Sequence, residues 1–250
     1  MIRGQERIEV ITRYLVYYYN TNVTFRFRHR KLRQVLMLTR SFFKDVPECD
    51  TQYMVEMKKK TIGAGNRFWI GPEHPLFSQY IAYILTSTNA SSCLEVGYQC
   101  GGLTIPAALT LIKKNPNALY VGIDNEEDEN AKGQRPLILE YLHERGVENQ
   151  VHLFTGDANE VTEKILVNSL PGLCFDVVVI DHAKAAYPDC FELLEERKLI
   201  SNESIIFFHD IYSWARNEWL YMKRRFRDYY WLGIPQIMCG LGLAMKKPGD

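Results

Sequence analysis

From residue 76 onward, short apolar runs alternate with longer segments of helical periodicity, and this alternation constrains the fold more than any other feature of the chain. It is typical of a parallel sheet whose strands are joined by helices on both faces. We therefore predict an α/β domain with a mostly parallel, seven-stranded sheet. The expected strands span residues 93–96, 119–123, 151–154, 175–180, 205–208, 229–231 and 241–246, and the expected helices span residues 76–86, 103–114, 136–145, 161–167, 187–198 and 214–227.

A glycine-rich turn follows the first of these strands. Residues 95–102 read EVGYQCGG, in which Tyr98 and Gln99 occupy places where a dinucleotide-binding turn needs glycine. The next strand ends in Asp124, where a carboxylate can accept hydrogen bonds from the ribose of an adenosine. An adenosine without a pyrophosphate indicates S-adenosylmethionine and not NAD, on a Rossmann-like, doubly wound sheet. The alternative is that residues 95–102 are only a tight strand-to-helix connection and that Asp124 is only an exposed carboxylate, so that neither binds a ligand.

The composition of the chain limits the classes of protein to which it can belong. The chain has 250 residues, 46% of them hydrophobic, and a net charge of zero, which fits a globular enzyme and gives no global attraction to nucleic acid. Residues 1–40 carry nine arginines and lysines against two glutamates, so we expect residues 1–60 to form a helical extension with a basic face and residues 61–250 to form the α/β domain. No run approaches the ~18 apolar residues of a membrane span. Six cysteines without C-x-x-C spacing indicate reduced thiols, and we expect a cytoplasmic protein.

Polar residues gather after four consecutive predicted strands. Asp124 ends the second strand, residues 156–159 (GDAN) follow the third, residues 181–184 (DHAK) follow the fourth, and His209 and Asp210 follow the fifth. Ligands of parallel sheets lie beyond the carboxyl ends of the strands, so these residues are expected to share a site. Asp181, His209 and Asp210 form a plausible ligand set for Mg or for Mn, Co or Zn. The alternative is that His209 and Asp210 merely cap the next helix.

Residues 90–249 resemble the catechol O-methyltransferase branch of the class I S-adenosylmethionine-dependent methyltransferases. The resemblance rests on LEVG at 94–97, VVIDHAK at 178–184, LLEE at 193–196 and GLxxAxxKPG at 240–249. It implies a metal ligand at Asp181, an adenine neighbour at His182, a ribose ligand at Asp124 and a catalytic base at Lys184. The base role requires a lowered pKa for Lys184. The expected cofactor-binding residues are Glu95, Gly97, Tyr98, Gln99, Gly101, Asp124, Asn125, Asp157, Ala158, Asn159, Asp181 and His182.

The chain also departs from that family's pattern. His209 and Asp210 stand where the resemblance expects Asp and Asn, which replaces a hard oxygen by a nitrogen and puts Mg in question. Ala183 takes the place of an aromatic gate, and an acidic residue for a second catechol hydroxyl falls near Gly233. Leu103 replaces a serine, although the hydroxyl of Thr104 is adjacent. Trp69 and Trp214 are candidates for an apolar wall around the acceptor.

These observations predict a metal-assisted O-methyltransferase that acts on a hydroxyl of a small, catechol-like or phenolic molecule, with no nucleic-acid partner. Two alternatives remain. The basic run at residues 223–227 (KRRFR) could meet an acceptor that bears a phosphate or CoA group. The chain could also be a non-catalytic relative that binds the cofactor and serves as an interaction protein. The sequence does not predict an oligomeric state.

Overall fold

A computed structural model describes residues 30–44 and 74–248, apart from residues 128–131, 167, 169–171, 236 and 238. The chain divides into two compact units, residues 1–48 with 248–250 and residues 49–247. In the first unit the described part is the amphipathic helix α2 (Arg30–Lys44). The expected boundary near residue 60, the remainder of the expected extension and Trp69 fall outside the described residues, and those expectations stay predictions.

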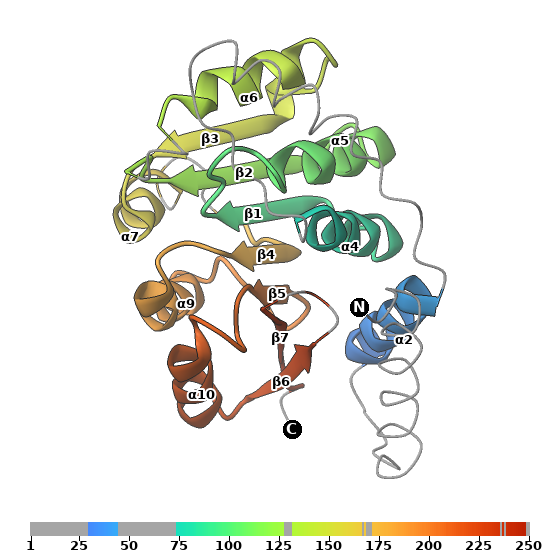
Figure 1. The fold of residues 1–250 in the computed structure, drawn as a ribbon, viewed down its shortest axis with the longest axis vertical. Helices are drawn as coiled ribbons and strands as arrows, with labels where there is room; N and C mark the ends of the chain where they lie inside the picture. The colour runs from blue at the N-terminus through green and yellow to red at the C-terminus, as the bar shows by residue number, and fades with distance from the viewer. Residues whose placement is uncertain are drawn as a thin grey trace, which may run out of the picture. The chain divides into compact units, whose positions relative to one another are not determined.

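The second unit contains the predicted seven-stranded sheet, in the order β3-β2-β1-β4-β5-β7-β6 (Figure 1). The five strands β3, β2, β1, β4 and β5 are parallel to one another. Strand β7 runs antiparallel to both of its neighbours, β5 and β6. The predicted doubly wound, mostly parallel fold is therefore confirmed. The strands are β1 (Ser92–Val96), β2 (Leu119–Asp124), β3 (Val151–Thr155), β4 (Val177–Ile180), β5 (Ile205–Phe208), β6 (Tyr229–Ile234) and β7 (Leu241–Lys246).

Helices cover both faces of this sheet, with α4, α5 and α6 in one layer and α7, α9 and α10 in the other (Figure 1). Strands β4 (VVVI) and β5 (IIFF) are buried at every position, as expected for central parallel strands that pack against helices on both sides. The helices are α4 (His74–Ser87), α5 (Thr104–Lys114), α6 (Gln134–His143), α7 (Ala158–Val161), α9 (Tyr187–Glu196) and α10 (Arg216–Arg225), with a π-helical turn at Thr162–Leu166 and 3₁₀ turns at Glu148–Gln150 and Lys184–Ala186.

Most element boundaries differ from the prediction by a few residues, and the helix expected at residues 161–167 is instead the short helix α7 followed by a π-helical turn. Two of these differences follow from hydrogen bonding. The last helix begins at Arg216 and not at residue 214, because the carbonyl of Asp210 accepts the amides of Ser213 and Ala215 and so closes a turn before the helix. Strand β6 continues to Ile234, three residues beyond its expected end, because it stays paired with β7 as far as Leu241. Among the described residues, no helix is both long enough and apolar enough to cross a membrane.

Candidate active site

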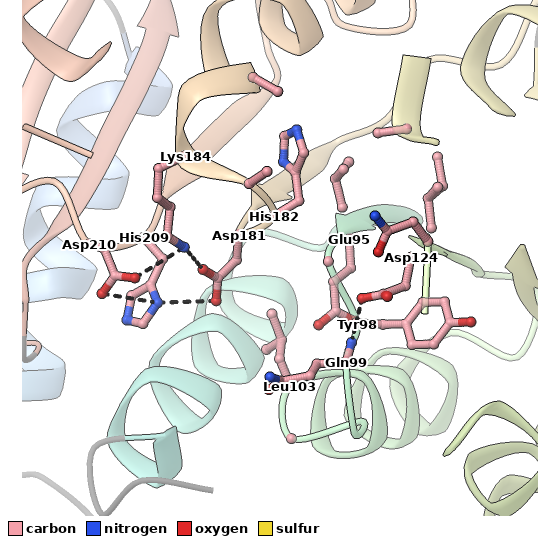
Figure 2. A pocket seen from close by; sticks show the side chains of 18 of the residues that line it. Glu95, Tyr98, Gln99, Leu103, Asp124, Asp181, His182, Lys184, His209 and Asp210 are labelled. Carbon is pink, nitrogen blue, oxygen red and sulfur yellow. Dashed lines mark hydrogen bonds and ion pairs between the residues drawn. The ribbon is translucent and has the colours of Figure 1, made fainter. Parts of the chain in front are cut away.

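A cavity of about 640 Å³ lies beyond the carboxyl ends of β1, β2, β4 and β5. It therefore occupies the place where doubly wound sheets bind their ligands, at the reversal of strand order between β1 and β4. Figure 2 shows two groups of polar residues in it, one around Asp124 and one around Lys184. The lining includes Phe77, Glu95, Gly97, Tyr98, Gln99, Leu103, Asp124, Asn125, Glu127, Gly156, Asp157, Ala158, Asp181, His182, Ala183, Lys184, His209, Asp210, Trp214 and Cys239.

The glycine turn joins the two groups. Gly97 has φ of +99°, and a Cβ atom at this position would lie 2.4 Å from the carbonyl oxygen of Asp181, so no larger residue fits. Its amide donates to the carbonyl of Ile123 at 2.7 Å. The turn after β1 is thus packed directly against the first residue after β4 and hydrogen-bonded to β2.

Asp124 is held by the same turn. Its Oδ2 accepts the backbone amide of Gln99 at 2.8 Å, and its Oδ1 accepts the amide of Glu126 at 2.7 Å. The side chain of Glu126 in turn accepts the hydroxyl of Tyr98 at 2.7 Å. Each carboxylate oxygen of Asp124 can accept more than one hydrogen bond, so these contacts orient the carboxylate in the cavity without exhausting it.

Glu95 is a buried carboxyl group in the wall of the cavity, with 2% of its surface exposed. Its Oε2 accepts the hydroxyls of Thr104 and Tyr120, both at 2.6 Å. Burial raises the pKa of Glu95 to about 8, although these two hydrogen bonds oppose the shift. The hydroxyl of Thr104 is thus engaged with Glu95 and does not replace the expected serine in the lining, where Leu103 stands.

His182 lies in the cavity with both ring nitrogens buried, and neither has a hydrogen-bond partner among the described residues. Burial and the neighbouring Lys184 lower its pKa to about 4, so the imidazole is neutral at physiological pH. Buried polar atoms in native proteins are nearly always paired. This imidazole therefore has the features of a group that meets a ligand.

Four ionisable side chains form a compact cluster at the other end of the cavity (Figure 2). The ammonium of Lys184 lies 2.5 Å from Oδ1 of Asp181 and 3.0 Å from Oδ2 of Asp210. Nδ1 of His209 lies 3.1 Å from Oδ2 of Asp181 and 3.6 Å from Oδ1 of Asp210. Two carboxylates thus alternate with two basic groups at the ends of β4 and β5.

The cluster lowers the pKa of Asp181 and raises the pKa values of Lys184 and His209, so that it favours the charged form of each. Burial alone would raise the pKa of Asp181, but His209 and Lys184 hold it well below its usual range. Burial alone would lower the pKa of Lys184 and of His209, but the carboxylates of Asp181 and Asp210 raise both. For Lys184 this is opposite to the lowered pKa that a role as a base requires, so these side chains by themselves favour an ammonium.

Neighbouring elements fix the imidazole of His209 in this cluster. The ring of Phe77 in α4 stacks on it with centroids 4.5 Å apart and an interplanar angle of 7°. The hydroxyl of Tyr187 in α9 donates to the carbonyl oxygen of His209 at 3.3 Å. His209 and Asp210 are therefore oriented toward Asp181 and Lys184.

The cavity brings together nearly all of the residues that the sequence singled out. Two expected cofactor residues do not line it, and their assignment stays a prediction. Gly101 packs against α6, where a Cβ atom would lie 2.8 Å from the side chain of Ile138. Asn159 lies in a second, acidic groove between α7 and α9. Asp157 lines the cavity but also caps α7, because its carboxylate accepts the amides of Asn159 and Glu160.

Sequence reasoning missed several lining residues. Phe77 lies in a helix upstream of the sheet, and Cys239 lies in the turn between β6 and β7. Neither follows a parallel strand, so the rule that located the polar residues could not find them. Residues that face the cavity from outside the β–α turns carry no local signal of that position.

Residues 94–211 match a sequence family described as a methyltransferase domain. A comparison with curated proteins finds no match.

Solved structures share the fold at low sequence identity. The O-methyltransferase TomG from Streptomyces achromogenes, in complex with S-adenosylmethionine, is 17% identical with a TM-score of 0.57, and the match covers 99% of this chain and 100% of TomG. A methyltransferase from Geobacter sulfurreducens is 16% identical with a TM-score of 0.56, covering 81% of this chain and 92% of that one. The Podospora anserina methyltransferase PaMTH1, with S-adenosylhomocysteine bound, is 15% identical with a TM-score of 0.54, covering 96% of each chain. Residues 94–211 are therefore similar to a methyltransferase domain, and the chain shares its fold with solved O-methyltransferases.

Proposed function

We propose that the protein is an S-adenosylmethionine-dependent O-methyltransferase that acts on a hydroxyl group of a small, catechol-like or phenolic molecule. The observation that carries this proposal is the presence of two kinds of polar group in one cavity. Asp124 and the glycine turn suit an adenosine, and the charged cluster around Lys184 suits an acceptor hydroxyl. TomG, which shares the fold, was solved with S-adenosylmethionine bound.

His182 supports the fit of the cofactor to this cavity. Its neutral ring has one donor and one acceptor nitrogen, both buried and without a described partner, which is the complement of the polar edge of an adenine. S-adenosylmethionine supplies a methyl group bonded to a sulfonium sulfur. We propose that its site in the cavity is formed by Glu95, Gly97, Tyr98, Gln99, Asp124, Asn125, Asp157, Ala158, Asp181 and His182. Gly101 and Asn159, which lie outside the cavity lining, remain predicted cofactor residues.

The cluster also fits a divalent metal by its donor chemistry. Asp181, His209 and Asp210 offer ligand atoms that all lie within 4.8 Å of one another. Two carboxylates and one imidazole suit Mn, Co or Zn better than Mg. The ammonium of Lys184 contacts both carboxylates and would have to share them with the ion. We propose these three residues as the ligands, where a metal would lower the pKa of the acceptor hydroxyl.

Lys184 is the proposed proton acceptor. In that role a neutral amine would take the proton of the acceptor hydroxyl at Nζ. Because Asp181 and Asp210 raise the pKa of Lys184, the role requires a metal bound to these two carboxylates to oppose that shift. Their contacts with Nζ, at 2.5 Å and 3.0 Å, suit the state that follows proton transfer. The protein's other contribution is to hold the acceptor oxygen and the methyl group in one cavity, which removes much of the entropic cost of bringing them together.

Transfer of a labelled methyl group from S-adenosylmethionine tests the proposal. The purified protein is offered catechols, phenols and acyl-CoA thioesters, with and without a chelator, and the products are identified by mass spectrometry. We expect a methyl ether of a catechol or phenol. A protein that binds S-adenosylmethionine but methylates none of these hydroxyls would contradict the proposal and favour a non-catalytic binding role.

A further inference from the structure

The basic residues of α10 have no part in the cavity, because none of them lines it. Their side chains are exposed, and only Arg225 forms an ion pair with a described residue, Glu192. Residues 212–227 hold five basic residues and one glutamate, in a chain whose net charge is zero. Positive charge is therefore concentrated on this segment, and most of it is not neutralised by a described residue.

Exposed apolar side chains gather in the same segment. Tyr212, Trp214, Leu220 and Tyr221 are 39% to 75% exposed, and they are four of the five exposed large hydrophobic residues in the described part of the chain. Single exposed hydrophobic residues are common and need no explanation by themselves. Four of them within ten residues, beside a concentration of positive charge, form a surface that a partner can cover.

The spacing of residues in α10 places both kinds of side chain on one face. Trp219 is buried in the core, so the opposite side of the helix faces outward. Arg216, Leu220 and Arg224 follow one another at intervals of four residues on that outward side, and all three are exposed. Tyr221 lies in the adjacent row. Arginines therefore alternate with apolar side chains along the outer face of this helix.

A lysine that follows β7 extends this face beyond the end of α10. The Nζ atom of Lys247 donates to the carbonyl of Arg227 at 2.6 Å and lies 5.7 Å from the centre of the ring of Tyr230. Figure 1 shows α10 at the end of its helical layer, next to α9. Two separate elements thus bring basic side chains to the same place.

The needs of the helix itself do not account for all of these charges. Cations stabilise the C-terminus of a helix and are unfavourable at its N-terminus. Lys223, Arg224 and Arg225 stand in the last turn of α10 and agree with this rule. Arg216 is the first residue of the helix, where the rule disfavours a cation. Its positive charge is therefore better explained by an external anion than by folding.

We propose that the outward surface formed by Arg216, Leu220, Tyr221, Arg224 and Lys247, the α10 face, docks on an anionic phospholipid membrane. The basic groups pair with lipid phosphates, while the leucine and the tyrosine enter the headgroup region, as in helices that lie in the membrane interface. Trp214 precedes α10 by two residues and lines the cavity, so docking brings one wall of the cavity near the lipid surface. The inference does not depend on the proposed function.

The order of side chains on the α10 face favours lipid over other anionic partners. Protein interfaces deplete charged residues from their centre and keep a polar rim, whereas here Leu220 stands between Arg216 and Arg224. Nucleic-acid phosphates suit the arginines but offer the leucine no apolar contact. A phospholipid surface presents phosphates directly above apolar chains, so it satisfies both kinds of side chain at once.

Co-sedimentation with vesicles tests the inference. The parent should bind vesicles of equimolar phosphatidylcholine and phosphatidylserine, and should bind vesicles of phosphatidylcholine alone much more weakly. Arg216→Gln/Arg224→Gln should lower the partition coefficient for the mixed vesicles about 20- to 30-fold, because each basic residue near an anionic surface contributes about 1 kcal/mol. Leu220→Ser/Tyr221→Ser should lower it about 3- to 10-fold. The matched control Lys113→Gln/Lys132→Gln removes two exposed lysines outside α10 and should bind like the parent.

Thermal unfolding followed by circular dichroism checks that all variants are folded. Equal binding to both kinds of vesicle, binding to neither, or parental binding by Arg216→Gln/Arg224→Gln would overturn the inference. Sedimentation equilibrium identifies the protein alternative, in which the acidic groove between α7 and α9 receives the α10 face of a second copy. A parent that associates with itself and not with vesicles, together with a monomeric Arg216→Gln/Arg224→Gln variant, would assign the α10 face to a protein contact and reject lipid docking.

Discussion

The buried carboxyl of Glu95 predicts how the stability of this protein depends on pH. Its pKa is about 8 in the folded protein, against a usual value of 4.5. Between these pH values the folded protein keeps a proton that the unfolded chain has lost, so the free energy of unfolding falls as the pH rises. The stabilisation from this proton is complete below pH ~4.5 and is lost as the pH passes through about 8.

The size of the effect follows from the two pKa values. A difference of one pKa unit corresponds to about 1.4 kcal/mol. The contribution of Glu95 therefore falls by roughly 2 kcal/mol between pH 6 and pH 8. For a chain of this size, that loss corresponds to a decrease in melting temperature of roughly 4 to 8 °C.

Glu95→Gln removes the ionisation while keeping the shape of the side chain and an acceptor for the hydroxyls of Thr104 and Tyr120. We expect the variant to lose this part of the pH dependence, so that its stability relative to the parent increases by roughly 2 kcal/mol between pH 6 and pH 8. Urea unfolding followed by circular dichroism at pH 6, 7 and 8 measures the slope. Glu203→Gln, a change at an exposed carboxylate in the turn before β5, is the control. A Glu95→Gln variant with the same pH slope as the parent and the control would refute the assignment of a neutral, buried Glu95.

Three further predictions concern ligands and chemistry. Asp124→Asn should weaken binding of S-adenosylhomocysteine in titration calorimetry by about 1.5 to 3 kcal/mol, because a charge-assisted hydrogen bond to the ribose is lost. Chelation should abolish methyl transfer, added Mn, Co or Zn should restore it, and His209→Asp should move the preference toward Mg because it replaces a nitrogen ligand by oxygen. Lys184→Ala should lower kcat by about 10²- to 10⁴-fold with cofactor affinity nearly intact, and Lys184→Arg should not restore it, because a guanidinium keeps its proton.

Each of these predictions has a contradicting result. Equal affinities for the parent and Asp124→Asn would remove the ribose role. Full activity in excess chelator would leave Asp181, His209 and Asp210 as structural residues. Parental turnover in Lys184→Ala would require the hydroxyl proton to leave by another route.

The polar half of the site could be predicted from the sequence because its residues obey one local rule. Asp124, Asp181, His209 and Asp210 each stand at the end of an apolar run, and parallel strands bring such ends to the same edge of the sheet. Apolar runs of three to six residues bounded by turns also predicted the strands themselves.

Other features depend on distances that no local pattern encodes. The double ion pair of Lys184, which raises its pKa, requires the side chains of Asp181 and Asp210 to face each other across two strands. The stacking of Phe77 on His209 joins residues that are far apart in the chain. The position of Trp214 was predicted to be helical, and the turn at Asp210 that places it in a loop depends on a backbone φ of +61° at a non-glycine residue.

The attachment of the loop after β5 has a consequence for evolution and engineering. The backbone at residues 211–215 is held by the carbonyls of Asp210, Cys239 and Gly240 and by the ring of Tyr212, while the side chain at position 214 is mostly in water. Little folding energy therefore rests on the identity of residue 214, and a single codon can vary there without moving the loop. A library restricted to that codon would vary one side chain of the cavity lining on an unchanged backbone.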